Sequence, residues 1–113
     1  MKLKNFVLAF IFLSFAAVIN APAQFNITGS VVGRVVSAGG GSVRRANVTI
    51  INLQTLDTQT RTTNDFGYFR FNDLPIIDLY LVTVSSKRHI FTFANQVFQF
   101  GELEHNMTFT SDD

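Results

Sequence analysis

The sequence predicts an all-β protein: a seven-stranded β-sandwich with Greek-key-like connections, preceded by an N-terminal signal peptide. Two observations predict this fold. After the first 23 residues, apolar and polar side chains alternate in short runs, and no helical periodicity occurs. Gly, Pro, Asn and Asp residues separate these runs, as they do in β-sandwiches. The expected strands are 31–37, 46–53, 58–63, 68–72, 79–85, 90–100 with a break at 94–96, and 103–110.

The first 23 residues have the pattern of a secretory signal peptide. Lys2 and Lys4 precede an apolar run over 6–19, and Ala21-Pro22-Ala23 supplies the small residues of a cleavage site. The apolar run is short for a membrane-spanning helix, although an uncleaved anchor is the alternative. No cysteine follows the site, which excludes a bacterial lipoprotein. We therefore expect a secreted, periplasmic or cell-envelope protein that begins at Gln24 and has no membrane span after cleavage.

The mature chain is long enough for one domain, with a lead-in over 24–29, a sandwich over 30–110 and a tail over 111–113. Nine of the 13 phenylalanines follow the cleavage site, so aromatic packing must stabilise a domain that has no cysteine. Without Lys2 and Lys4, seven basic and eight acidic side chains remain. This balance argues against a nucleic-acid partner. Two basic pairs occur, Arg44-Arg45 and Lys87-Arg88, and both are interpreted as solvated loop charge.

The first three expected strands differ in their patterns. The first contains Gly33, and a glycine inside a strand predicts a bulge or a close approach of another group. In the second, Ala46, Val48 and Ile50 share one face. The third is rich in threonine and has no large apolar side chain, which is typical of a solvated edge strand.

The fourth and fifth strands are separated by turn residues. A polar turn with a glycine, 64–67, leads into the fourth strand, in which Phe69 and Phe71 share a face. A short loop at Leu74-Pro75 leads into the fifth strand. The residues expected to point inward from that strand are Tyr80, Val82 and Val84. We interpret the two strands as a β-hairpin.

The sixth expected strand carries four phenylalanines that change parity at the break. Phe91 and Phe93 are at odd positions, whereas Phe98 and Phe100 are at even positions. A bulge that inserts one residue would return all four rings to one face. The last strand places three apolar residues on one face, and residues 111–113 are expected to fray after it. The three apolar residues are Leu103, Met107 and Phe109.

Several short motifs follow one another in a characteristic order. They are Val32-Gly33-Arg34-Val35-Val36, Arg45-Ala46-Asn47-Val48-Thr49-Ile50, Thr62-Thr63-Asn64-Asp65-Phe66-Gly67-Tyr68-Phe69-Arg70-Phe71, Leu74-Pro75 and Tyr80-Leu81-Val82-Thr83-Val84. In this order they resemble the carboxypeptidase regulatory-like domain, one of the transthyretin-like (prealbumin-like) β-sandwiches, over about 30–110. Ser85-Ser86-Lys87-Arg88-His89-Ile90-Phe91-Thr92-Phe93 is similar to a bacterial subgroup found in secreted and cell-surface proteins. The family usually has a glycine just before the tyrosine of the fifth strand, where this chain has Leu79. The resemblance implies a non-catalytic accessory domain without zinc ligands.

The residues themselves indicate no catalytic, cofactor-binding or metal site. His89 and His105 lack the spacing of zinc ligands, and we expect both to pack at the edge of the core. Ser85 and Ser86 lie too close to His89 along one strand to form a triad with it. Lys87, the only mature lysine, lies at a strand end, where it is unsuited to an isopeptide crosslink.

A cation site at Asn64, Asp65 and Asp73 is an alternative to a turn at 64–67. Calcium needs several oxygen ligands in one loop, whereas an Asn-Asp-x-Gly sequence is typical of a turn in which side chains bond the backbone. We therefore favour the turn and expect no metal and no cofactor.

The sequence therefore predicts a non-enzymatic structural or protein-interaction module at the cell envelope, which binds an unknown protein or carbohydrate at the cell surface. Binding would use loops at one end of the sandwich or the exposed edge 58–63. One alternative is a carbohydrate-binding domain that uses exposed aromatic rings, and another is a separately encoded accessory subunit of a secreted enzyme. Two or more coplanar exposed rings would favour sugar binding. The rings concerned are Phe66, Tyr68, Phe98 and Phe100. The series Phe91, Phe93, Phe98 and Phe100 is a candidate binding platform, but we favour its burial in the core, because a domain of this size needs those rings inside.

Overall fold

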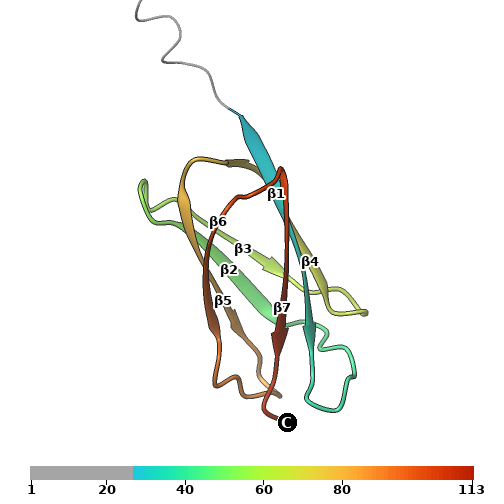
Figure 1. The fold of residues 1–113 in the computed structure, drawn as a ribbon. Helices are drawn as coiled ribbons and strands as arrows, with labels where there is room; N and C mark the ends of the chain where they lie inside the picture. Colours follow the sequence, from blue (N-terminus) through green and yellow to red (C-terminus); the bar gives the residue numbers. More distant parts are fainter. Residues whose placement is uncertain (1–26) are drawn as a thin grey trace, which may run out of the picture.

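The computed structural model describes residues 27–113, which form seven strands and no helix. The strands are β1 (Thr28–Val36), β2 (Asn47–Asn52), β3 (Thr58–Thr62), β4 (Tyr68–Pro75), β5 (Leu79–Ser85), β6 (Asn95–Gln99) and β7 (Glu104–Thr110). They make a three-stranded sheet, β4-β1-β7, that packs against a four-stranded sheet, β3-β2-β5-β6 (Figure 1). The predicted seven-stranded β-sandwich is confirmed. The predicted signal peptide lies outside the described residues.

No helix in residues 27–113 is long and apolar enough to cross a membrane.

Strand β1 is the centre of the smaller sheet, because it pairs antiparallel with β4 and parallel with β7. Gly33 lies opposite Phe69 across the β1–β4 pair, and a Cβ atom added to Gly33 would lie 2.1 Å from the Phe69 ring. The glycine in this strand therefore allows the close approach that the sequence predicts. β1 begins at Thr28, inside the expected lead-in 24–29.

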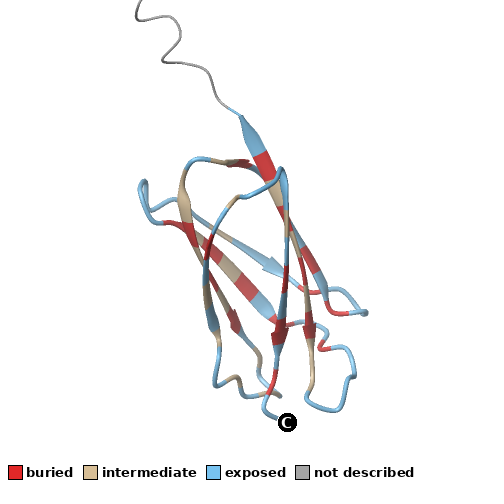
Figure 2. Cartoon of the chain, in the orientation of Figure 1, coloured by how far each residue is buried: buried red, intermediate tan, exposed pale blue. Residues whose placement is uncertain are grey.

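The core lies between the two sheets and follows the predicted alternation. Figure 2 shows buried positions alternating with exposed or intermediate ones along the strands. The predicted inward residues of the expected second, fourth and fifth strands are all buried. They are Ala46, Val48, Ile50, Phe69, Phe71, Tyr80, Val82 and Val84. The predicted edge strand is also confirmed, because β3 is at the edge of the larger sheet and most of its residues are exposed.

The predicted hairpin between the fourth and fifth strands is wrong. β4 pairs with β1 and β5 pairs with β2, so the chain crosses from one sheet to the other between them. Leu74 and Pro75 belong to the end of β4 instead of a loop, and Leu74 is buried. The Tyr80 hydroxyl donates a hydrogen bond of 2.7 Å to the Pro75 carbonyl, which links the two strands across the sandwich.

The C-terminal part differs from the sequence prediction in three ways. Residues 86–94 form a loop between β5 and β6, so the first half of the expected sixth strand is not a strand. Leu103 precedes β7 and is 60% exposed, whereas Met107 and Phe109 are buried as predicted. Residues 111–113 do not fray, because the Ser111 N–H bonds the Val36 carbonyl and the Asp112 N–H bonds the Ile90 carbonyl.

Candidate functional site

The phenylalanines expected on one face do not form an exposed aromatic platform. Phe98 is buried, and Phe91 and Phe100 pack against the core. Phe93 is 80% exposed, so the four rings do not share a face. The parity argument fails here because Phe91 and Phe93 lie in a loop, where alternation no longer decides which side a residue faces.

His105 closes the β6–β7 side of the sandwich by stacking on an aromatic ring. Its ring lies 4.1 Å from that of Phe98, with 4° between the planes, and it meets Phe100 edge-on at 6.5 Å. Burial lowers the pKa of His105, because the charged form loses hydration there. The expected edge-of-core packing of His105 is therefore confirmed.

Phe66 and Tyr68 are exposed, but they lie at a turn and are not stacked on each other. The Asn64 side-chain oxygen accepts the N–H groups of Phe66 and Tyr68 at 3.0 and 2.9 Å, and Gly67 has a φ of +81°. The predicted turn at 64–67 is thereby confirmed. The Arg34 guanidinium lies 5.1 Å from the centre of the Tyr68 ring. Within residues 27–113, no two exposed rings are stacked in the way that would favour sugar binding.

The serine, histidine and lysine side chains considered for catalysis, metal binding or crosslinking do not form a site together. The Ser86 hydroxyl accepts the N–H of Arg88, and His89 Nδ1 lies 3.3 Å from an Asp113 oxygen, so the hydrogen bonds of these side chains do not join a serine to a histidine. In the part of the chain that the structure describes, no three His, Asp or Glu side chains gather in a group that could hold a metal ion. Lys87 is exposed in a loop.

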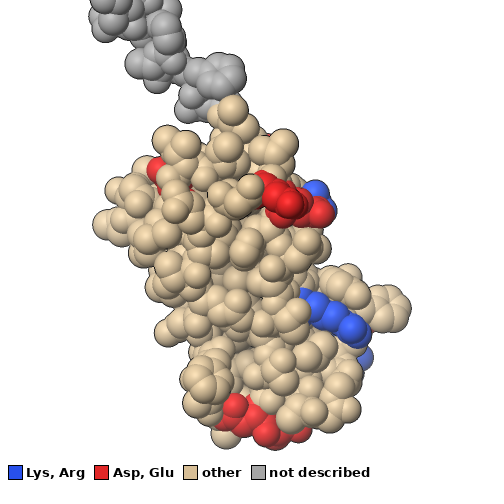
Figure 3. All heavy atoms as spheres, in the orientation of Figure 1, with Lys and Arg blue, Asp and Glu red and all other residues tan. Residues whose placement is uncertain are grey.

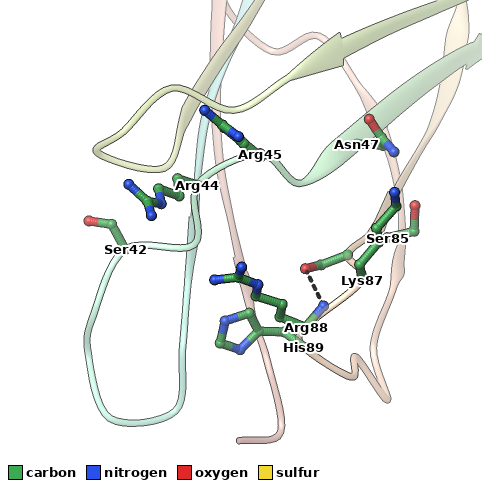
Figure 4. Close-up of a pocket in the computed structure, with 9 residues that line it drawn as sticks. Ser42, Arg44, Arg45, Asn47, Ser85, Lys87, Arg88 and His89 are labelled. Atoms are coloured by element: carbon green, nitrogen blue, oxygen red, sulfur yellow. Dashed lines mark hydrogen bonds between the residues drawn. The ribbon is translucent and has the colours of Figure 1, made fainter.

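The most distinctive surface feature is a hollow of about 740 Å³ at one end of the sandwich. It joins the two basic pairs, Arg44-Arg45 from the β1–β2 loop and Lys87-Arg88 from the β5–β6 loop. Figure 4 shows the two loops on opposite sides of the opening, with the Arg88 side chain extending toward Arg44. Polar side chains complete the lining of this basic hollow. They are Ser42, Asn47, Ser85, Ser86 and His89.

Pairing of β2 with β5 brings the two loops together. Asn47, the first residue of β2, lies opposite Ser85, the last residue of β5. The residues just before Asn47 and just after Ser85 must therefore emerge side by side. The sequence interpretation of both basic pairs as solvated loop charge agrees with their exposure, but it did not include their meeting at one hollow. Because the fifth strand was expected to pair with the fourth, no signal in the sequence brought these two loops together.

Buried Thr63 fixes the loop that carries Arg44 and Arg45. Its hydroxyl accepts the Ala46 N–H at 2.9 Å and donates to the Val43 carbonyl at 2.8 Å. Its backbone carbonyl accepts the Arg45 N–H at 3.1 Å, and its N–H bonds the Ala46 carbonyl. Arg45 has a φ of +57°, a conformation that costs a non-glycine residue energy and so depends on such bonds. The basic pair is thus presented by an ordered backbone.

The basic hollow contains no acidic side chain in its lining. The two ion pairs found within residues 27–113 are Arg70–Glu104 and His89–Asp113, so none of the four cations of the hollow has a carboxylate partner there. On the face drawn in Figure 3, charged side chains form small separate groups, with acidic ones in the upper part of the view and again at the C-terminal end, which lies beside the loops of the hollow. Four like charges around one hollow repel one another, and an anionic ligand would relieve that repulsion.

The opposite end of the β2–β5 pair has acidic groups. A smaller hollow of about 120 Å³ is lined there by Asp57, Asp73 and Tyr80, among others. Burial, together with the nearby charge of Asp78, raises the pKa of Tyr80 to about 12, so its hydroxyl stays protonated and donates to Pro75. The Asn52 amide donates to Asp78 at 2.9 Å. These contacts organise the fold at that end.

The fold thus defines a transthyretin-like β-sandwich with a basic hollow at one end. The carboxypeptidase regulatory-like domain family matches residues 30–103, and the chain belongs to this family. The family resemblance seen in the sequence motifs is therefore confirmed. No curated protein matches the chain significantly.

The fold is similar to part of several bacterial pilins. It matches a streptococcal ancillary pilin (TM-score 0.62, 10% identity), the major pilin SpaD of Corynebacterium diphtheriae (0.61, 17%) and the major pilin subunit BcpA of Bacillus cereus (0.61, 10%). The matches cover 74%, 75% and 74% of this chain but 31%, 30% and 29% of the pilins. The chain thus spans about a third of the length of these proteins. At such low identity, the similarity shows the fold alone.

Proposed function

We propose that this chain is a secreted, non-enzymatic structural or protein-interaction module of the cell envelope, and that it contacts its partner through the basic hollow. The observation that carries the proposal is the convergence of four cations from two loops at one end of a rigid sandwich. Binding residues are commonly found on loops that a scaffold positions in this way. Membership of a regulatory-like domain family and the likeness to pilin folds support the same function.

Export is the first part of the proposal that can be tested. The pattern of residues 1–23 predicts cleavage after Ala23. Mass spectrometry of the protein recovered from culture medium and envelope fractions should therefore find a chain that starts at Gln24. An intact chain that begins at Met1 and remains with the membrane fraction would contradict the proposal.

The binding end can be tested by crosslinking in the living cell. A photo-crosslinking residue would replace Ser42 at the basic hollow or, as the matched control, Ile77, which is 81% exposed in the turn between β4 and β5. We expect a discrete covalent adduct with another envelope protein at Ser42 and none at Ile77. Equal adduct formation at both positions, or none at either, would count against an interaction through this end.

A further inference from the structure

We propose that the basic hollow binds an acidic polypeptide segment, a run of Asp or Glu side chains in a partner protein. This inference rests on the proposed function and names the chemistry of the partner. Arg guanidinium groups form paired hydrogen bonds with carboxylates, and the Lys ammonium group supplies a further charge. The hollow offers both kinds of cation with serine hydroxyls and an asparagine amide between them.

The size and spread of the charges favour an extended segment over a single small anion. The cations come from two separate loops around about 740 Å³, a volume in the range of pockets that enclose a drug-sized ligand. A site for one phosphate instead concentrates its donors on one point, commonly as adjacent backbone N–H groups. Here most of the lining residues are exposed, and only Ser86 and His89 are half-buried. Several separated carboxylates would match this arrangement.

An anionic membrane is a poorer match than a peptide. The β5–β6 loop does expose Ile90 and Phe93, at 73% and 80%. However, Asp112 accepts two hydrogen bonds from Thr92, and an Asp113 oxygen lies 3.5 Å from the Ile90 nitrogen. These carboxylates lie beside the apolar residues that would enter the bilayer, where they would repel anionic headgroups. Asp113 also lies 3.3 Å from His89 at the edge of the hollow, whereas the four Arg and Lys side chains of the lining form no ion pair within residues 27–113 and stay available to a peptide.

The test uses the exported protein and a fluorescent hexaglutamate peptide as the probe, with binding followed by fluorescence anisotropy. We expect saturable binding that weakens as salt is added, and no binding of hexaglutamine. Joint replacement Arg44→Gln and Lys87→Gln should weaken binding about twofold to thirtyfold, the range for two exposed ion pairs. The control variant Arg70→Gln removes the cation of the Arg70–Glu104 pair, which is not part of the hollow's lining. This variant should bind hexaglutamate as tightly as the unchanged protein does.

Three outcomes would overturn the inference: no hexaglutamate binding, equal loss in the control and double variants, or equally tight binding of inorganic phosphate, phosphatidylglycerol vesicles or a short oligonucleotide. Thermal unfolding of both variants would verify that they are folded. The experiments distinguish failure of the acidic-segment inference from failure of the proposed function. A crosslink at Ser42 without hexaglutamate binding would reject the acidic segment and leave the interaction module in place. Hexaglutamate binding without that crosslink would reject the proposed envelope partner.

Discussion

Replacement of Thr63 by valine should destabilise the domain and loosen the loop that carries Arg44 and Arg45. Valine has nearly the shape of threonine but replaces the hydroxyl with a methyl group. The Thr63 hydroxyl makes two hydrogen bonds, to the Ala46 N–H and the Val43 carbonyl, and the residue is only 4% exposed. The substitution therefore removes two bonds without creating a cavity.

The magnitude follows from the two backbone groups that would lose their partner. A buried donor or acceptor left without a hydrogen bond costs about 1–3 kcal/mol. Because Arg44 and Arg45 beside them are exposed, water can reach this loop in part, so we expect a total loss of about 2–4 kcal/mol. For a domain of this size, 1 kcal/mol changes Tm by about 4–8 °C. The expected fall in Tm is therefore at least about 8 °C.

Two variants serve as controls for this thermal unfolding measurement. Thr63→Ser keeps the hydroxyl and should cost only about 1 kcal/mol for the lost methyl group. Thr62→Val changes the exposed neighbouring residue, whose hydroxyl makes one long contact of 3.5 Å with Asn47, and should be nearly neutral. If Thr63→Val melted at the same temperature as Thr62→Val, the argument that Thr63 fixes the basic loop would be refuted.

Three further predictions concern the core, the pH dependence and metal ions. Phe69→Ala should cost about 3–5 kcal/mol and Val82→Ala somewhat less, because both side chains are buried; unchanged melting temperatures would contradict their inward positions. Burial lowers the pKa of His105, so the unfolded chain takes up this proton first, and stability should fall as the pH drops below about 6.5. Thermal unfolding of His105→Gln should show less of this acid loss, and an identical profile would contradict it. Finally, a chelator, calcium or zinc should leave Tm unchanged; a fall of several degrees on chelation would direct attention to Asp65 and Asp73.

Inside β2, β4 and β5, residue alternation predicted which side chains enter the core, but it failed at Phe93 and Leu103 outside the strands and did not predict which strands pair. Phe69 and Val82 face inward as expected, because in a strand every second residue points to the same side. Alternation does not indicate which strand a given strand pairs with. A short connection can either return the chain to a neighbouring strand of the same sheet or carry it to the opposite sheet. Here Asp73 has a φ of +59°, Leu74 is buried and Pro75 cannot donate to a ladder, and the chain crosses. The hairpin interpretation failed at this choice.

The amino-acid composition also did not reveal the candidate site, because it does not say which residues the fold brings together. Residues 24–113 have seven basic and eight acidic side chains, and this balance describes the segment as a whole and not any one surface. Four of its seven basic side chains gather at one end because β2 and β5 are adjacent, although the pairs are more than forty residues apart in sequence. Each pair alone has the composition of an ordinary solvated loop. Once the strands pair, the fold holds like charges together without a carboxylate between them, which weakens the native state slightly by mutual repulsion. A ligand that supplies the missing negative charges gains the relief of that repulsion as binding free energy, and for this reason the basic hollow is the place where we expect the partner to bind.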